Sequence, residues 1–221
     1  TLNGATMGTR YSVIAYAEPA FDAQTLGRKL HAAISYVDAV MSNWKQDSDI
    51  NRLNRAAIGE WVALPPNLLC VLQAALAIEA QSGAAFDIGV GATVGAWGFG
   101  PYAGAVSMHS PAPRPVTGQS LELDPIGGRA RKHAPLCLDL SGIAKGFGVD
   151  RLAEILQSAS LSSWLVSIDG ELRAGAPKPD GTRWAIALEK PVVGIRKTSG
   201  VIEIADTAIA TSGTYRHCRE E

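Results

Sequence analysis

Apolar residues recur every three or four positions over residues 22–41 and 67–82, which predicts a helix in each segment. The same spacing predicts a helix over 144–158, and Asp47 and Ser48 offer caps to a short helix that follows them. Strands are predicted at 6–17, 136–140, 163–168, 171–175, 183–189, 200–205 and 207–211. Helices and antiparallel strands in separate blocks indicate an α+β fold, with mixed helices packed on antiparallel sheets.

Two central segments fit neither pattern. Residues 84–100 (AAFDIGVGATVGAWGFG) are apolar but rich in glycine, which indicates close approach of the backbone to another group and neither a simple helix nor a simple strand. Residues 101–135 hold many Pro, Gly and Ser residues and are predicted to be mainly loop.

Composition narrows the class of protein. The 221 residues are 47% hydrophobic and 19% charged, with a formal net charge of −1. This length allows one substantial domain or two small fused ones, and the balance of residues is ordinary for a globular protein. It gives no reason to expect nucleic acid, which requires a basic surface. No apolar stretch approaches the ~18 residues of a membrane span, so we expect no transmembrane segment. We also expect no signal peptide, because the chain starts almost directly in a strand-like run.

Cysteine and histidine are spaced without a metal-binding pattern. The cysteines (Cys70, Cys137, Cys218) are far apart and odd in number, so we expect buried or partly buried thiols rather than disulfides or a zinc site. The four histidines also lack ligand spacing, which makes a histidine-based transition-metal site improbable.

Residues 138–146 (LDLSGIAKG) are the clearest candidate for chemistry. A strand, a Ser-Gly turn and a helix N-terminus together form a site that binds phosphate, because the first helical amides are unpaired and lie at the positive end of the dipole. Lys145 adds a cation, and Asp139 offers an acceptor for a ligand hydroxyl or amide. The alternative from composition alone is a glycine-containing turn beside a solvated lysine, and the two remain open at this point.

Three other signals are weaker. The spacing Gly89-x-Gly91-x-x-x-Gly95 lacks the βαβ context of a dinucleotide fold. Trp97 and Phe99 lie between glycines, where they either stack on a planar heterocycle or pack in the core. The hydroxyls of 211–213 (TSG) either contact phosphate or end a strand, and no Ser/His/Asp triad accompanies them.

Seven blocks, taken in order, resemble the ApbE family of flavin transferases. They are residues 6–9 (TMGT), 41–54 (MSNWKQDSDINRLN), 85–88 (AFDI), 97–100 (WGFG), 139–146 (DLSGIAKG), 167–173 (SIDGELR) and 211–216 (TSGTYR). The resemblance implies a T-fold-like α+β architecture, a single domain over 1–221 and an FAD:protein FMN transferase. Such an enzyme cleaves FAD, its substrate, attaches FMN through a phosphoester to a Thr or Ser of a partner flavoprotein, and releases AMP. It also implies a requirement for Mg²⁺, a hard cation suited to phosphoryl transfer.

The resemblance also implies the site residues. The predicted FAD-binding residues are Met7, Trp44, Ala85, Phe86, Asp87, Asp139 and Lys145. The backbone carbonyl of Gly142 is the predicted metal ligand, and no catalytic residue is assigned.

After residues 211–216, family members continue with a His-x-(I/V)-Asp-Pro-x-Thr-Gly segment and an Ala-Asp-(A/G)-x-(A/D)-Thr motif that supplies further metal ligands. This chain ends at Glu221 without either, so we expect a trimmed form that lacks the C-terminal metal-binding segment. Two alternatives remain: an FAD-binding relative without transferase activity, and a Mg²⁺-dependent FAD pyrophosphatase that gives FMN and AMP. The resemblance further implies a periplasmic, membrane-associated lipoprotein at the inner membrane whose acceptor is a flavoprotein subunit of a membrane redox complex.

Overall fold

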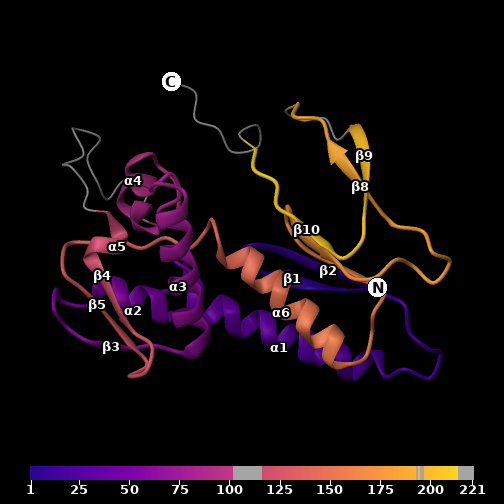
Figure 1. The fold of residues 1–221 in the computed structure, drawn as a ribbon, viewed down its shortest axis with the longest axis horizontal. Coiled ribbons are helices and arrows are strands. Elements are labelled where there is room, and N and C mark those ends of the chain that lie inside the picture. Colours follow the sequence, from indigo (N-terminus) through magenta and orange to yellow (C-terminus); the bar gives the residue numbers. More distant parts are fainter. Residues whose placement is uncertain (102–115, 193, 195–196, 214–221) are drawn as a thin grey trace. The chain divides into compact units, whose positions relative to one another are not determined.

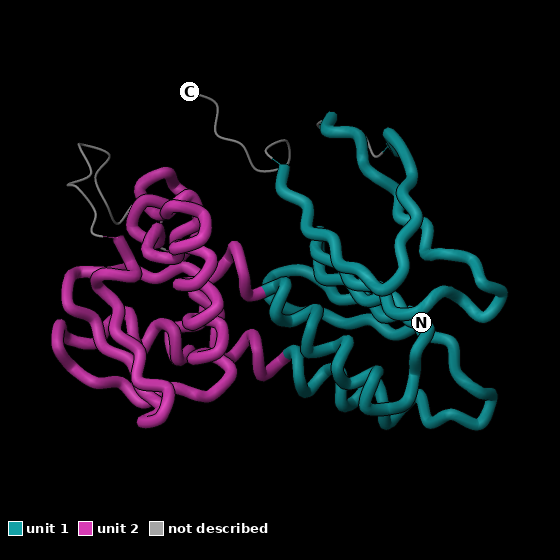
Figure 2. The backbone as a smooth tube through the Cα atoms, viewed as in Figure 1, with its two compact units in different colours: residues 1–34, 145–221 teal, residues 35–144 magenta. Residues whose placement is uncertain are grey.

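The computed structural model describes residues 1–101, 116–192, 194 and 197–213. Contacts along the chain divide it into two compact units, coloured separately in Figure 2. Unit 1 comprises residues 1–34 and 145–221, and unit 2 comprises residues 35–144. The single domain expected over 1–221 stays a prediction, and each unit is described by itself below.

Unit 1 is built on a five-stranded antiparallel sheet in the order β1-β2-β6-β7-β10. These strands are Leu2–Thr6 (β1), Thr9–Ala15 (β2), Trp164–Ile168 (β6), Glu171–Ala174 (β7) and Thr207–Ile209 (β10). Side chains of β6 alternate between buried and half-buried, as expected for a strand with one face on the core. Asp169, at φ 55°, and Gly170 form the short turn between β6 and β7, where the sequence predicts one.

Two helices cover one face of this sheet (Figure 1): α6 (Ala144–Ser158) and the first part of α1 (Ala23–Met41). A Cβ placed on Gly148 of α6 would lie 2.8 Å from Cδ1 of Ile34 in α1 and 2.9 Å from Cδ1 of Ile168 in β6. The absence of a side chain at Gly148 therefore lets α6 approach both elements closely. On the facing sides of α1 and α6, the apolar residues that recur at helical spacing are buried.

A two-stranded hairpin of β8 (Trp184–Glu189) and β9 (Thr198–Ile204) completes unit 1. Trp184 and Ile204 are buried with Ala174 of β7, and half-buried apolar side chains of the sheet and the hairpin pack around them. The Trp184 Nε1–H donates to the carbonyl of Ala176 at 3.0 Å, so the one polar atom of the indole is paired.

The first predicted strand, 6–17, is wrong at its N-terminal end. Met7 and Gly8 both have positive φ, 46° and 71°, and they form the turn of a hairpin between β1 and β2. Two consecutive left-handed residues match the twist of a tight hairpin, and glycine adopts that conformation readily. The β-branched run therefore begins its strand only at Thr9.

Unit 2 combines short helices with a small antiparallel sheet. Its elements after α1 are α2 (Asp49–Arg55), β3 (Val62–Ala63), α3 (Pro66–Gln81), the 3-10 turn η1 (Ile88–Val90), α4 (Gly91–Ala96), α5 (Thr117–Ser120), β4 (Leu121–Asp124) and β5 (Arg129–Lys132). The sheet order is β3-β5-β4. Of the two predicted caps of α2, Ser48 is the one used: its hydroxyl accepts from Asn51 N at 3.3 Å.

Three predictions in unit 2 need correction. Residues 117–132 are not loop, because they form α5 and the β4–β5 hairpin, whose turn is held by Asp124 Oδ1 accepting from Gly127 N at 2.8 Å. The glycine-rich segment contains a short helix, α4. Residues 136–140 form no strand, since their backbone pairs with side chains, as described below.

The other predictions of architecture are confirmed. Helices α1, α3 and α6 begin and end within one residue of the predicted ranges, and the α+β class is correct. Cys137 is half-buried as expected, but Cys70 is exposed on α3, contrary to prediction. His109, His217 and Cys218 lie outside the described residues. In the described part of the chain, no helix combines the length and apolar character that crossing a membrane requires.

Candidate functional site

Asp139 lies at the end of an extended segment of unit 2, directly before the turn that leads into α6. Its carboxylate Oδ1 accepts from Ser141 N at 2.8 Å, and the carbonyl of Leu140 accepts from Ile143 N and Ala144 N at 3.0 and 2.8 Å. Asp139 is buried, while Ser141 and Gly142 are exposed. The sequence predicts this turn correctly. The carboxylate of Asp139 stabilises the turn by accepting from Ser141 N.

The segment before the turn is extended but lies in no sheet. Leu138 N donates to Asn54 Oδ1 at 2.8 Å, and Leu138 O accepts from Asn54 Nδ2 at 2.9 Å. Asp139 N donates to the carbonyl of Ile88 at 2.7 Å. The predicted strand is therefore absent because side-chain amides and isolated backbone groups of residues 88 and 91 take the place of a neighbouring strand.

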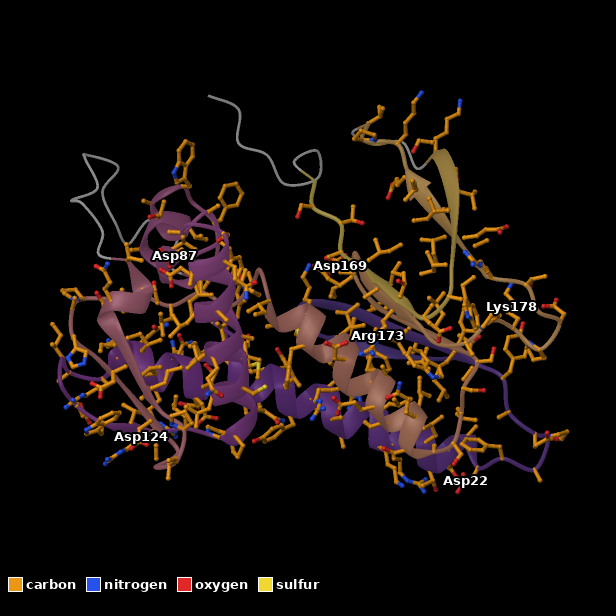
Figure 3. All side chains as sticks on the ribbon, in the orientation of Figure 1. Asp22, Asp87, Asp124, Asp169, Arg173 and Lys178 are labelled. Carbon is orange, nitrogen blue, oxygen red and sulfur yellow. The ribbon has the colours of Figure 1, made fainter. Side chains whose placement is uncertain are left out.

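Phe86 and Asp87 approach this turn from the glycine-rich segment. A Cβ on Gly142 would lie only 3.2 Å from Cε2 of Phe86, so the phenyl ring lies against the Gly142 backbone. Asp87, labelled in Figure 3, caps η1: its Oδ1 accepts from Gly89 N at 2.7 Å and from the Thr117 hydroxyl at 2.5 Å. Ala85 is exposed, and both Phe86 and Asp87 are half-buried. The structure thus brings Phe86 together with Gly142.

The close backbone approach predicted from the glycines of 84–100 is confirmed, and the partner is the chain itself. Gly91 N donates to the carbonyl of Cys137 at 2.9 Å, and a Cβ on Gly91 would lie 2.7 Å from that oxygen. A Cβ on Gly89 would meet the Thr117 hydroxyl. The absence of a side chain at these glycines therefore allows the chain to pack closely in this region.

Trp44, Trp97 and Phe99 are the exposed aromatic residues among the candidates. Their side chains are 71%, 51% and 39% exposed. Trp97 and Phe99 are therefore not fully buried in the core, and part of each of the three side chains faces solvent. Exposed rings of this kind are available to stack on a planar ligand.

Met7 and Lys145 belong to unit 1. Lys145 Nζ lies 3.1 Å from Glu171 Oε2 and 3.5 Å from Asp169 Oδ2, at the β6–β7 turn labelled by Asp169 in Figure 3. The lysine is therefore paired with carboxylates, contrary to the alternative of a solvated lysine. Met7 lies over α6, because its Cε is 3.5 Å from the position of a Cβ on Gly148.

Residues 211–213 and the β6–β7 turn lie close together in unit 1. A Cβ on Gly170 would lie 3.2 Å from the carbonyl oxygen of Thr211. The structure therefore brings two family blocks together at this turn. The rest of the final block, 214–216, lies outside the described residues.

A pocket elsewhere in unit 2 was not predicted from the sequence. It has a volume of about 490 Å³ and is lined by Arg52, Arg55, Ala56, Glu60, Trp61, Val62 and Ala63. The guanidinium groups of Arg129 and Arg131 lie 4.5 and 4.4 Å from the centre of the Trp61 ring. None of the predicted FAD-binding residues lines this pocket.

Sequence reasoning also missed the asparagines that hold the turn. Asn51 and Asn54 lie on α2, three positions apart, and so share a helix face. The signal that points to these asparagines is their spacing on one helix face, together with a buried segment that has no strand partner.

Comparison with known proteins settles the family. The model of the ApbE family matches residues 7–221. The chain belongs to the ApbE family. The resemblance found from the seven blocks is thereby confirmed.

Two curated relatives match the whole chain. The FAD:protein FMN transferase of Vibrio cholerae is 37% identical over 227 residues, and that of Haemophilus influenzae is 32% identical over 233 residues. In both cases the match covers 100% of this chain and 67% of the relative. The chain therefore spans about two thirds of the length of these curated ApbE relatives.

Solved structures agree with the fold. The flavin transferase ApbE from Vibrio cholerae superposes with a TM-score of 0.85 at 35% identity, covering 100% of this chain and 73% of that one. The apo form of Pseudomonas stutzeri flavinyl transferase ApbE superposes with a TM-score of 0.82 at 29% identity, covering 100% and 72%. The ApbE-like α+β architecture expected from the resemblance is confirmed.

Proposed function

We propose that this chain acts as part of an FAD:protein FMN transferase, which cleaves FAD and attaches FMN through a phosphoester to a Thr or Ser of a partner flavoprotein, releasing AMP. Curated relatives with this name, 37% and 32% identical over the whole chain, support the assignment. The observation that carries it is the turn at residues 139–142, where an exposed Ser-Gly pair precedes the 15-residue helix α6 above a buried carboxylate.

In this proposal the predicted FAD-binding residues contact different parts of FAD. Helix α6 attracts phosphate through its N-terminal dipole, and Lys145 provides the cation once a phosphate oxygen displaces Glu171 and Asp169 from its ammonium group. Trp44 offers a flat exposed surface for the isoalloxazine ring. Met7, Ala85, Phe86, Asp87 and Asp139 complete the proposed FAD contacts, in keeping with the family resemblance.

Magnesium dependence is part of the proposal, with the Gly142 carbonyl as a ligand. Among the described residues, no three His, Cys, Asp or Glu side chains gather in a group that could hold a metal ion. These residues therefore do not fit a complete magnesium site. Omitting Mg²⁺ from the assay tests the requirement for the cation.

The acceptor and the location are proposed from the resemblance alone. We expect the acceptor to be a flavoprotein subunit of a membrane redox complex that carries the modified Thr or Ser. We expect the protein to be periplasmic and anchored to the inner membrane by a lipid. Fractionation of cells that express the full-length gene product measures this directly, and a cytosolic product would contradict it.

The test of function is an incubation with FAD, MgCl₂ and an acceptor that carries a flavinylation motif. The full-length gene product and the 221-residue chain are compared, each with and without Mg²⁺. We expect flavin fluorescence on the denatured acceptor and release of AMP with the full-length product and Mg²⁺, and weak FAD binding without transfer by the 221-residue chain.

Other outcomes identify the alternatives. Free FMN and AMP without labelled acceptor would indicate an FAD pyrophosphatase. Unchanged FAD with every sample would indicate a flavin-binding relative without chemistry. Efficient transfer by the 221-residue chain would show that these 221 residues suffice for the reaction.

A further inference from the structure

The backbone of residues 138–140 is held by two asparagine side chains from a distant part of unit 2. In addition to the Asn54 pairing with Leu138, Asn43 Nδ2 donates to Leu138 O at 2.7 Å, and Asn43 Oδ1 accepts from Leu140 N at 3.3 Å. A side-chain amide has the same donor and acceptor as a peptide group. Asn54 therefore pairs with Leu138 as the residue of a neighbouring strand would, and Asn43 extends the pairing past Asp139.

Both asparagines are themselves fixed in place. The carbonyl of Asn43 accepts from Asn51 Nδ2 at 2.8 Å, and the same Asn51 amide donates to the carbonyl of Lys45 at 2.9 Å. The carbonyl of Asn54 accepts from the buried Lys132 Nζ at 2.5 Å. Because Asn43 and Asn51 are 7% and 5% exposed, little water is available to replace a lost partner.

We call Asn43 and Asn54 the clamp, because their side chains bond to the backbone on both sides of Asp139. Hydrogen bonds to these asparagines hold Leu138 on one side of Asp139 and Leu140 on the other, and Ile88 accepts from Asp139 N. The clamp therefore holds the backbone on both sides of Asp139, whose carboxylate accepts from Ser141 N in the turn.

We propose that Asn43 and Asn54 are positioning residues for the flavin site, acting through Asp139. This inference rests on the proposed function. It differs from a purely structural role in one measurable respect: loss of the clamp weakens FAD binding only as long as the Asp139 carboxylate is present.

The test is a double-mutant cycle on the 221-residue chain, with FAD affinity measured by calorimetric titration. The four proteins are wild type, Asn54→Ala, Asp139→Asn and the double variant. Asn at position 139 can still accept from Ser141 N, so the turn keeps its hydrogen bond. We expect each single variant to weaken FAD binding by about fivefold or more, and the double variant to bind no more weakly than Asp139→Asn, because coupled residues are not additive.

A matched control separates positioning from stability. Val71 is buried on α3 of the same unit and has no hydrogen-bonding side chain, so Val71→Ala lowers the melting temperature without touching the clamp. We expect its FAD affinity, measured on folded protein, to equal that of wild type. Equal weakening by Val71→Ala, or multiplicative losses in the cycle, would overturn the inference.

A second variant covers the case in which Asn54→Ala does not fold. Asn43→Ala removes the partner of Leu140 N and leaves the Asn54 pairing with Leu138. We expect the same non-additivity with Asp139→Asn and faster amide hydrogen exchange at Leu140; unchanged exchange and affinity would contradict the proposal. If Asp139→Asn alone leaves FAD affinity unchanged, or wild type binds no FAD, the proposed site fails and the inference fails with it.

Discussion

Strand β6 of unit 1 and the 137–140 segment of unit 2 are both extended and apolar, yet they are held by different means. Strand β6 pairs with β2 on one side and β7 on the other, and its buried positions alternate. In the 137–140 segment three consecutive residues, 138–140, are buried, and asparagine side chains take the place of a strand. An apolar run therefore predicts an extended backbone but not what pairs with it.

The difference has a consequence for tolerance to mutation. A strand in the middle of a sheet shares its hydrogen bonds among many peptide groups, none of which a side-chain substitution removes. The 137–140 segment depends on a few named side chains, and it lies beside the proposed flavin site. Single substitutions should therefore affect β6 through packing and the 137–140 segment through lost polar partners or lost space.

The largest loss in the free energy of unfolding is expected from a substitution in β6. Trp164 is 2% exposed and packs against Gly175, where a Cβ would lie 2.6 Å from the indole. Trp164→Ala should lower the free energy of unfolding by about 3–5 kcal/mol, as for large-to-small core substitutions. Urea unfolding measures this value, and a loss below ~1 kcal/mol would show that the sheet does not depend on its apolar face.

The next effect tests the space beside the 137–140 segment. Gly91→Ala places a Cβ 2.7 Å from the Cys137 carbonyl oxygen, so the free energy of unfolding should fall by about 1–3 kcal/mol. Gly146→Ala is the matched control, since no other group lies within 4 Å of its Cβ, and alanine should stabilise α6 by about 0.5–1 kcal/mol. Thermal unfolding of both variants should show shifts of opposite sign; equal shifts would refute the close approach.

A third prediction contrasts an exposed tryptophan with the buried one. Trp44→Ala should weaken FAD binding by about 1–2 kcal/mol if the ring stacks on the flavin. Because Trp44 is 71% exposed, its effect on the free energy of unfolding should stay within ~0.5 kcal/mol. Titration with FAD and a melting curve on the same preparation give both numbers. A lower melting temperature with unchanged affinity would assign Trp44 to structure.

The smallest effect concerns the exposed hairpin of unit 2. Hydrogen bonds from Arg131 and, to a smaller extent, from His133 hold the pKa of Glu122 below its ordinary value of 4.5. A carboxyl with a lowered folded-state pKa contributes stability that is present above pH 4.5 and is lost as the pH falls through the folded-state pKa. The melting temperature of wild type should therefore fall more steeply below pH 4.5 than that of Glu122→Gln, and parallel curves would contradict the pairing.

Local pattern predicted much of this fold. The spacing of Leu30, Ile34 and Val37 is enough to place α1, since a helix buries whichever residues recur at its own period. The turn at 139–142 could also be predicted, because Asp, Ser and Gly in that order favour a tight turn before a helix. Residues 117–132 could not, because the Pro-rich and Gly-rich composition around them concealed the β4–β5 hairpin, whose second strand pairs with the distant β3.

The sequence by itself determined the positions of α1, α3 and α6, the α+β class and the ApbE family, because periodicity and ordered motifs are properties of neighbouring residues. Only the tertiary structure decided what supports the turn at residues 139–142. Asn43 and Asn54 lie 95 and 84 positions before Leu138, and no local pattern reports which distant side chain meets a backbone group. Residues 136–140 have the sequence pattern of a strand but lie in no sheet, and their position depends on contacts that form when the chain folds.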